Sequence, residues 1–288
     1  MNDIVYLNGR FIPHNEARIS VHDRGFLYGD GLFDTIRAYR GVAFRIEDHL
    51  QRLFDSAAEL NLKIGADRAD LEKIITELLR RNGIEDAYVR ITITRGEHTG
   101  DLSFDSENSP TVLIVARPLR IAEDDYSRGV AATIVQNMSN PPDLSRHKIV
   151  SYLPYLYAHD MARRSGCREA ILTDADGMIL ESATGNIFVA VGKDVFTPPL
   201  TAGILPGIAR MTVLELLPTI SLHGHEEPLA VKDLAEADEI FMTNSIVEVL
   251  PIVRIDERIF GCRPGQYTRQ ILVAYRKKVV EYIGSRKL

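Results

Sequence analysis

The sequence predicts a two-domain protein of the α+β or α/β class. Its 288 residues, 45% of them hydrophobic, supply enough apolar side chains for one large or two medium-sized cores. Segments in which apolar and polar residues alternate, as in strands, are mixed along the chain with segments at helical spacing. A polar, acid-containing segment lies between them, so we expect a smaller α/β domain over 1–117, a linker over 118–128 and a larger domain over 129–288.

Composition argues against several classes of partner. The net charge of -6 comes without a basic stripe, so we expect a small-molecule ligand rather than a nucleic acid or a membrane surface. Cys167 and Cys262 have no second cysteine or histidine at ligand spacing, which argues against a metal site and a disulfide framework. No apolar run reaches the length of a bilayer span, and we expect a cytoplasmic protein.

The first elements are expected to be strands. Asn8-Gly9 separates the extended segments 4–7 and 11–12, which is a strong signal for a hairpin. A glycine-rich turn over 25–31 then leads into a strand over 32–39. Because side chains alternate along a strand, Phe33, Thr35 and Arg37 share one face of it.

Two amphipathic helices should follow, over 47–60 and 68–82. Arg52 falls opposite the apolar stripe of the first helix, so we expect it to point away from the core. Gly83 suits the C-terminal cap of the second. The next strand, over 88–94, places Tyr88 and Arg90 on a polar face, and an apolar strand over 111–116 completes this half.

The second half contains further strands and helices. Expected strands span 129–136, 169–173, 178–181, 186–191 and 240–250, the last interrupted at Thr243-Asn244-Ser245, and expected helices cover 152–165 and 266–283. Gly203 to Gly207 form a turn before a helix that begins near Ile208. Such a turn presents backbone N–H groups at the positive end of a helix, which suits an anion.

Lys148 is the residue that best suggests chemistry. It lies between a Pro-Pro turn and a helix, beside Arg146 and His147. A lysine that attacks a carbonyl must be desolvated or placed among other cations, because a free lysine is protonated near neutral pH. Taken alone, the same segment also fits a solvated loop lysine.

Several segments together resemble a known family. "RGFLYGDGLFDTIRAYRG", "HLQRLFDSA", the lysine segment, "DGMILESATGNIFV", "TPPLTAGILPGIAR" and "ADEIFMTNSIVEVLPI" occur in the order seen in class IV aminotransferases, the fold-type IV enzymes that depend on pyridoxal phosphate. The resemblance covers nearly the whole chain. It implies a smaller N-terminal α/β sandwich domain, a larger cofactor-binding domain with a strand-rich, barrel-like core, and a homodimer.

The resemblance also implies roles for individual residues. Lys148 matches the lysine that forms the internal aldimine with pyridoxal 5'-phosphate and then moves the substrate proton. Glu181 matches the carboxylate that meets the pyridine nitrogen, and Tyr152 matches the tyrosine that hydrogen-bonds the phenolic oxygen of the cofactor.

The phosphate of the cofactor would be bound by a separate set of residues. Arg52 matches the family's phosphate-binding arginine, and the remaining donors come from two turns: Gly207, Ile208 and Ala209 in one, Asn244 and Ser245 in the other. Many relatives have threonine in place of Ala209. The backbone donor is kept here, but one hydroxyl is lost.

The substrate is less determined. Tyr88 and Arg90 match residues of branched-chain aminotransferases, and we add Phe33, Arg37 and Ile246 as substrate-binding candidates. Thr35 and Asn244 instead resemble aminodeoxychorismate lyases, which eliminate pyruvate and form an aromatic amine. The arginine–histidine pair of Bacillus-type D-amino acid aminotransferases is not visible after Thr94.

These observations give one expected function and three alternatives. We expect amino transfer between a branched-chain or other small apolar amino acid and a 2-oxo acid. A lyase that forms 4-aminobenzoate and a D-amino acid aminotransferase use the same cofactor. A cofactor-free binding protein on the same fold, with Lys148 serving only the structure, is the alternative from another class.

Overall fold

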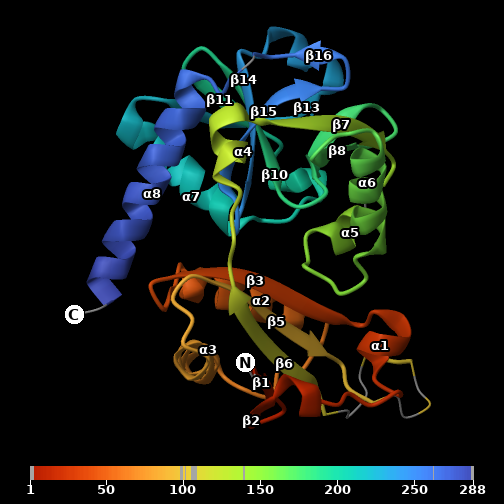
Figure 1. Ribbon diagram of the computed structural model, residues 1–288. Helices are drawn as coiled ribbons and strands as arrows, with labels where there is room; N and C mark the ends of the chain where they lie inside the picture. The colour runs from red at the N-terminus through yellow and green to blue at the C-terminus, as the bar shows by residue number, and fades with distance from the viewer. Residues whose placement is uncertain are drawn as a thin grey trace. The chain divides into compact units, whose positions relative to one another are not determined.

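A computed structural model describes residues 3–97, 100, 102–104, 109–138, 140–261 and 263–286 (Figure 1). It divides into two compact units. Unit 1 consists of residues 1–120, 147–152 and 281–288, and unit 2 of residues 121–146 and 153–280. Unit 1 therefore takes in two segments, 147–152 and 281–288, that the sequence-based division assigned to the larger domain.

Within the described residues, unit 1 contains a six-stranded sheet in the order β2-β1-β6-β5-β3-β4. Its strands are β1 (Ile4–Leu7), β2 (Arg10–Pro13), β3 (Gly31–Tyr39), β4 (Val42–Ala43), β5 (Ala87–Thr94) and β6 (Thr111–Pro118). All neighbours pair antiparallel. The Asn8-Gly9 turn joins β1 to β2 as the sequence predicts.

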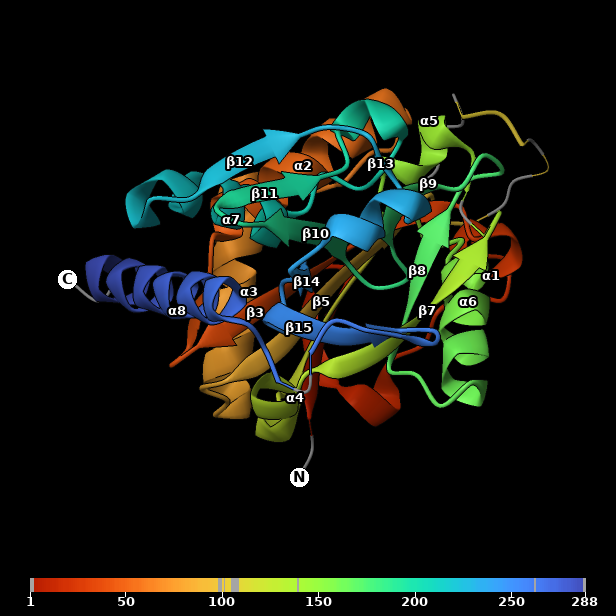
Figure 2. The same ribbon diagram turned by 90° about the horizontal axis from the view of Figure 1, so that it is seen from above.

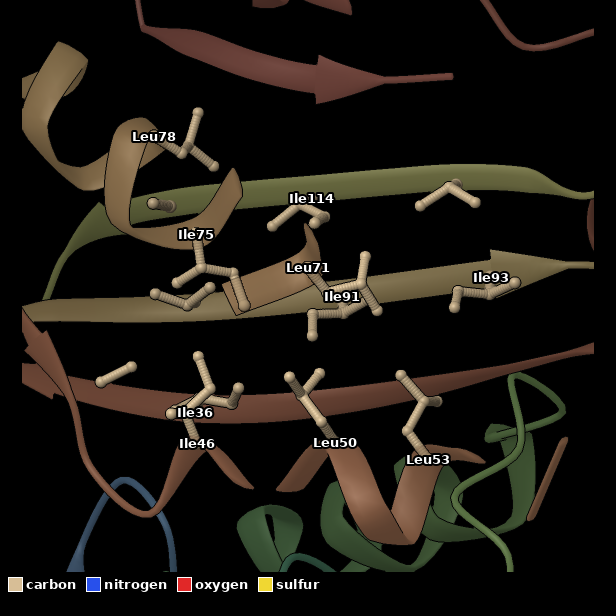
Figure 3. Close-up of a cluster of buried hydrophobic side chains, with 14 of the residues drawn as sticks. Ile36, Ile46, Leu50, Leu53, Leu71, Ile75, Leu78, Ile91, Ile93 and Ile114 are labelled. Atoms are coloured by element: carbon tan, nitrogen blue, oxygen red, sulfur yellow. The ribbon is translucent and has the colours of Figure 1, made fainter. Parts of the chain in front are cut away.

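Helices α2 (Ile46–Glu59) and α3 (Arg68–Asn82) pack on one face of this sheet. Figure 3 shows Ile36, Ile91 and Ile114 pointing from three strands toward the helices. All three are fully buried, as are Leu71 and Ile75 of α3. The period-2 alternation of β3 and β5 thus puts every second side chain into this core and leaves the others for the opposite face.

A short helix takes up part of the segment 25–31, which was expected to be a turn. Helix α1 (Arg24–Tyr28) begins after Asp23, whose carboxylate accepts the N–H of Gly25 at 2.7 Å. It ends at Gly29, which is left-handed with φ of 69°. A good N-cap and a glycine C-cap explain a helix of this length.

Residues 147–152 extend the sheet of unit 1 at the start of β3. Phe33 donates its N–H to the carbonyl of Lys148 at 2.8 Å, and Val150 donates to the carbonyl of Gly31 at 2.9 Å. Leu32 and Ile149 form the antiparallel bridge between these bonds. The backbone of the lysine segment is therefore fixed to β3.

Unit 2 contains a second sheet, which curls into a half barrel (Figure 2). Within the described residues it has ten strands in the order β12-β11-β10-β14-β15-β7-β8-β9-β13, with β16 paired to β15. They are β7 (Val130–Gln136), β8 (Glu169–Thr173), β9 (Met178–Ser182), β10 (Asn186–Val191), β11 (Asp194–Thr197), β12 (His223–Glu226), β13 (Leu229–Ala230), β14 (Glu239–Asn244), β15 (Glu248–Ile255) and β16 (Arg258–Ile259).

The helices of unit 2 are α4 (Glu123–Arg128), α5 (Pro142–Ser145), α6 (Leu153–Arg164) and α7 (Ile208–Leu216); α8 (Gln266–Arg286) begins in this unit. Helix α6 runs beside β7 and β8 in both views (Figures 1 and 2). Residues 118–128, expected to be a linker, contain α4. Its Tyr126 is buried and donates its hydroxyl to the carbonyl of Val247 at 3.0 Å, which holds this segment to unit 2.

Cys167 is a buried free thiol, and Cys262 lies outside the described residues. Among the helices of the described ranges, none combines the length and apolar character that crossing a bilayer requires.

Candidate active site

Lys148 lies beside two aromatic rings of unit 1. Its Nζ is 4.7 Å from the ring centroid of Phe33 and 6.0 Å from that of Tyr152. The two rings pack edge to face, with centroids 5.4 Å apart. The main-chain bond to Phe33 fixes the backbone of Lys148, so the start of the side chain has a defined direction.

His147 is held by two side chains of α2. It is buried, and its Nδ1 lies 3.0 Å from the hydroxyl of Ser56 on α2. Its Nε2 lies 3.6 Å from a carboxylate oxygen of Glu59. His147 was expected among the cations around Lys148, and its side chain anchors this segment to α2.

Arg52 is buried, contrary to the expectation that it points away from the core. Its Nε and Nη2 donate to Asp34 Oδ2 at 3.1 and 2.8 Å, and Nη2 also lies 2.9 Å from Oδ1. Its exposed fraction is 9%, and that of Asp34 is 1%. The position of Arg52 on the helix could not predict its burial, because its acidic partner Asp34 lies on β3 and not on the same helix.

His49 completes this buried polar cluster. Its Nδ1 lies 2.8 Å from Asp34 Oδ1. Burial lowers the pKa of His49 despite the neighbouring carboxylate, so the imidazole is neutral near pH 7 and donates Nδ1–H to Asp34. Burial alone would raise the pKa of Asp34, but the charge of Arg52, the contacts with His49 and the charge of Lys148 together outweigh burial and hold this pKa well below its usual range. Asp34 therefore stays ionised and orients Arg52.

The opposite face of the sheet carries the candidate substrate residues. Thr35 of β3 pairs with Arg90 of β5, and Arg37 pairs with Tyr88. The guanidinium of Arg90 stacks on the ring of Phe33, 3.7 Å from its centroid, and Nε donates to Thr92 at 3.1 Å. The structure thus brings all five predicted residues of unit 1 onto adjacent strands, as the alternation indicated.

Glu181 lies on β9 in unit 2 and is buried. Its Oε1 accepts the hydroxyl of Tyr155 and its Oε2 accepts the N–H of Leu205, both at 3.3 Å. Burial and the negative charge of Glu181 raise the pKa of Tyr155, so its hydroxyl remains a donor. Tyr155 was not among the residues predicted from the sequence. Its position three residues after Tyr152, on the first turn of a helix, was the available signal.

The anion site expected at Ile208 and Ala209 has suitable geometry. Gly207 is the N-cap of α7 and has no side chain that could cap this helix end. A Cβ on Gly207 would lie 2.0 Å from Asn186 Oδ1, so a larger residue here would displace the Asn186 side chain. The first N–H groups of α7 can therefore bind an oxyanion such as a phosphate.

The turn that carries Ser245 and Ile246 connects β14 to β15. Asn244 shapes it, because Asn244 Oδ1 accepts the N–H groups of Ile246 and Val247 at 2.9 and 2.8 Å. The amide of Asn244 also donates to the carbonyl of Thr184 at 3.1 Å. Asn244 thus acts on the turn itself, which leaves the hydroxyl of Ser245 as the side-chain donor for an anion.

Comparison with known proteins identifies the family. The model of amino-transferase class IV matches residues 31–255. The chain belongs to this family. The family match and the relatives named as aminotransferases indicate a transaminase that depends on pyridoxal phosphate. The lysine, glutamate and arginine assigned above lie within the matched range.

Relatives with different activities cover almost the whole chain. The chain is 36% identical to a putative branched-chain-amino-acid aminotransferase of Methanocaldococcus jannaschii, with 93% of each sequence covered. It is 30% identical to a D-alanine aminotransferase of Bacillus licheniformis, covering 96% of this chain and 97% of the relative. It is 29% identical to an aminodeoxychorismate lyase of Bacillus subtilis, covering 97% and 96%.

A solved structure supports the fold. The branched-chain aminotransferase of the thermophilic archaeon Thermoproteus uzoniensis, solved with norvaline, has a TM-score of 0.89 and 31% identity, covering 97% of this chain and 95% of that one. The fold-type IV architecture expected from the sequence is confirmed, and membership of the family implies pyridoxal phosphate as cofactor.

We predict that Asp34→Asn destabilises the protein by about 3–5 kcal/mol at pH 7, because it leaves the buried Arg52 without its counter-charge. The folded-state pKa of Asp34 is depressed, so its contribution is complete above about pH 4, the ordinary carboxyl pKa, and is lost as the pH falls further. Urea unfolding at pH 7 and pH 3 measures both effects.

The control is Asp70→Asn on α3. The Asp70 side chain is 55% exposed and lies 3.6 Å from Lys73. This exposed pair should change stability by less than about 1 kcal/mol. Equal stability losses for the two variants at pH 7 would rule out the assigned role of Asp34.

Proposed function

We propose that this protein transfers an amino group between an amino acid with a branched or small apolar side chain and a 2-oxo acid, using pyridoxal phosphate bound at Lys148. The observation that carries the proposal is the setting of Lys148: its backbone is bonded to β3, and its amine lies beside the rings of Phe33 and Tyr152. The resemblance described above implies a reactive lysine at this position, which lies within the matched residues 31–255.

The residues present fit this cofactor. Glu181 is a buried carboxylate suited to a protonated ring nitrogen, and Tyr152 supplies a hydroxyl for the phenolic oxygen. Arg52, oriented by Asp34, and the uncapped N-terminus of α7 supply donors for a phosphate. When bound, the group supplies an electron-withdrawing ring that stabilises the carbanion left when the substrate loses its α-proton.

The chain's own residues then move the proton and hold the substrate. We assign Lys148 as the base that takes the α-proton and the acid that returns it. Tyr155 keeps its proton and donates to Glu181, which orients the carboxyl group of Glu181.

The candidate substrate residues stay proposals. On the polar face of the sheet in unit 1, Arg90 and Arg37 are the candidates for the substrate carboxylate, because each carries a guanidinium that can pair with it. Tyr88 and Thr35 lie on the same two strands, and Ile246 is the candidate from unit 2.

Lyase chemistry is the second candidate. Thr35 and the Asn244-Ser245 turn favour it, and a relative of 29% identity is named as an aminodeoxychorismate lyase. D-amino acid transfer is a third, since a relative of 30% identity is a D-alanine aminotransferase. The 36% identity to a putative branched-chain aminotransferase and the Tyr88–Arg90 pair favour the first proposal.

The homodimer and the cytoplasmic location stay predictions. Exposed apolar side chains on and before α1 supply a surface for a second copy, with Val21 exposed to 67% and Phe26 to 75%.

The first test concerns Lys148. Pyridoxal phosphate should give the wild-type protein a visible absorption band, and borohydride should fix the cofactor to Lys148. Lys148→Ala should abolish the fixation, while Lys63→Ala, at an exposed position of the same unit, should not. A colourless wild-type protein would instead favour the cofactor-free alternative.

The second test concerns Glu181. Glu181→Gln should retain the cofactor and lower turnover by at least about a hundredfold, because a neutral amide cannot hold the proton of the ring nitrogen. Tyr155→Phe is the matched comparison: it removes one hydrogen bond and keeps the carboxylate, so its loss should be smaller. A normal half-reaction of Glu181→Gln with amino acids would contradict the assigned role.

The third test distinguishes the activities. L-leucine, D-alanine and aminodeoxychorismate are offered separately to the enzyme while the cofactor spectrum and pyruvate release are followed. We expect L-leucine to convert the cofactor to its amine form without an added 2-oxo acid. Catalytic pyruvate release with an aromatic product would favour the lyase, and conversion by D-alanine alone would favour the D-amino acid enzyme.

A further inference from the structure

A buried glutamate in unit 2 has no role in the proposed reaction. Glu169, the first residue of β8, is 1% exposed. Its Oε1 accepts the N–H of Ala170 at 2.9 Å, and its Oε2 accepts the hydroxyl of Thr184. A buried carboxyl costs stability unless it is hydrogen-bonded, so this pair of contacts requires an explanation.

Thr184 belongs to the tight turn that connects β9 to β10. Ser182 and Gly185 close this turn through the Ser182 N–H and the Gly185 carbonyl, 2.7 Å apart. A Cβ on Gly185 would lie 2.3 Å from the carbonyl oxygen of Thr243, so the turn packs directly on the backbone of β14. Thr184 is thereby placed next to the segment that leads to Ser245.

A continuous path of hydrogen bonds follows from Glu169. The carbonyl of Thr184 accepts the amide of Asn244 at 3.1 Å. The oxygen of the same amide holds the N–H groups of Ile246 and Val247. The path therefore ends in the turn of residues 244–247, which contains Ser245 of the proposed phosphate site.

The same β9–β10 turn is joined to the other part of that site. Glu181 accepts the N–H of Leu205, and Asn186 donates its amide to the carbonyl of Leu205 at 2.9 Å. Asn186 Oδ1 also lies against Gly207. Residues 181–186 thus contact both the loop before α7 and the 244–247 turn, and Glu169 holds them at Thr184.

We propose that Glu169 is a positioning residue, which acts through Thr184 and Asn244 to fix the 244–247 turn and thereby sets the affinity for the cofactor phosphate. This inference rests on the proposed function. Burial raises the pKa of Glu169 to about 7, with Arg168 the nearby charge that opposes this. Glu169 can bond to Thr184 in either protonation state. The ionised carboxylate accepts a hydrogen bond from the Thr184 hydroxyl, and the protonated acid donates one to the Thr184 oxygen.

The test uses the full chain and four variants. Thr184→Val removes the hydroxyl that donates to Glu169, whereas Thr184→Ser keeps a hydroxyl at this position. Glu169→Ala removes the carboxyl, whereas Glu169→Gln keeps both contacts, because its amide oxygen accepts from Ala170 and its amide N–H donates to Thr184. Thermal melting first confirms that each variant is folded.

Two measurements report on the turn. Hydrogen exchange of the Ile246 and Val247 amides should be faster in Thr184→Val and Glu169→Ala than in the wild type. The affinity for pyridoxal phosphate should fall about tenfold in both, as expected for one lost hydrogen bond of a buried group. The affinity for pyridoxal, which lacks the phosphate, should not change. Thr184→Ser and Glu169→Gln should match the wild type within about twofold.

The outcomes separate this inference from the proposed function. Unchanged exchange in Thr184→Val overturns the inference whether or not the protein binds the cofactor. An equal loss of affinity for pyridoxal and pyridoxal phosphate also overturns it. A third outcome is possible: exchange is faster in the variants, but the wild type binds no pyridoxal phosphate. This outcome supports the control of the turn by Glu169 and rejects the proposed function.

Discussion

The alternation of side chains along β3 is the constraint on which unit 1 depends. One face of the strand must be apolar to pack on α2 and α3, and Ile36 and Leu32 meet this requirement. The same face also carries Asp34, whose burial is compensated by Arg52 and His49. The other face holds the candidate substrate residues, and the edge pairs with the lysine segment. A shift of one residue in β3 would exchange these faces.

Buried acids in the molecule differ in how they are compensated, and the difference matches their proposed roles. Asp34 is paired with a guanidinium, and its lowered pKa keeps it ionised near neutral pH. Glu181 accepts two hydrogen bonds of 3.3 Å from neutral groups, which suits a carboxylate that is to meet a cationic ring. Glu169 accepts the hydroxyl of Thr184 and the N–H of Ala170. Burial raises its pKa to about 7, and both the neutral and the charged form can keep these two contacts.

Unit 2 arranges its candidate residues through backbone approaches that glycine permits. Gly185 allows the β9–β10 turn to lie against Thr243, and Gly207 allows the start of α7 to lie against Asn186. Because both approaches involve residues 181–186, the proposed ring-nitrogen acid and the two parts of the proposed phosphate site share one support. The family match extends over all of these segments.

Much of the fold could be predicted from the sequence because the signals are local. The Asn8-Gly9 hairpin, the Gly83 cap and the polar face with Tyr88 and Arg90 follow from turn chemistry and side-chain periodicity. The order of the motifs identified the family and its cofactor, whereas the choice of substrate stays a prediction. Helix α1 was missed because most of it, with its C-cap Gly29, lies within a glycine-rich segment that also fits a turn.

The tertiary structure alone decided the contacts between residues that are distant in sequence. Arg52 was expected to point away from the core and is buried, because its partner is Asp34 on a strand 18 residues earlier. The pairing of Tyr155 with Glu181 and the path from Glu169 to Asn244 likewise join separate elements. Periodicity shows which side of its own element a residue occupies, but only the packed structure shows which side chain it meets there and whether the cost of burying its charge is offset.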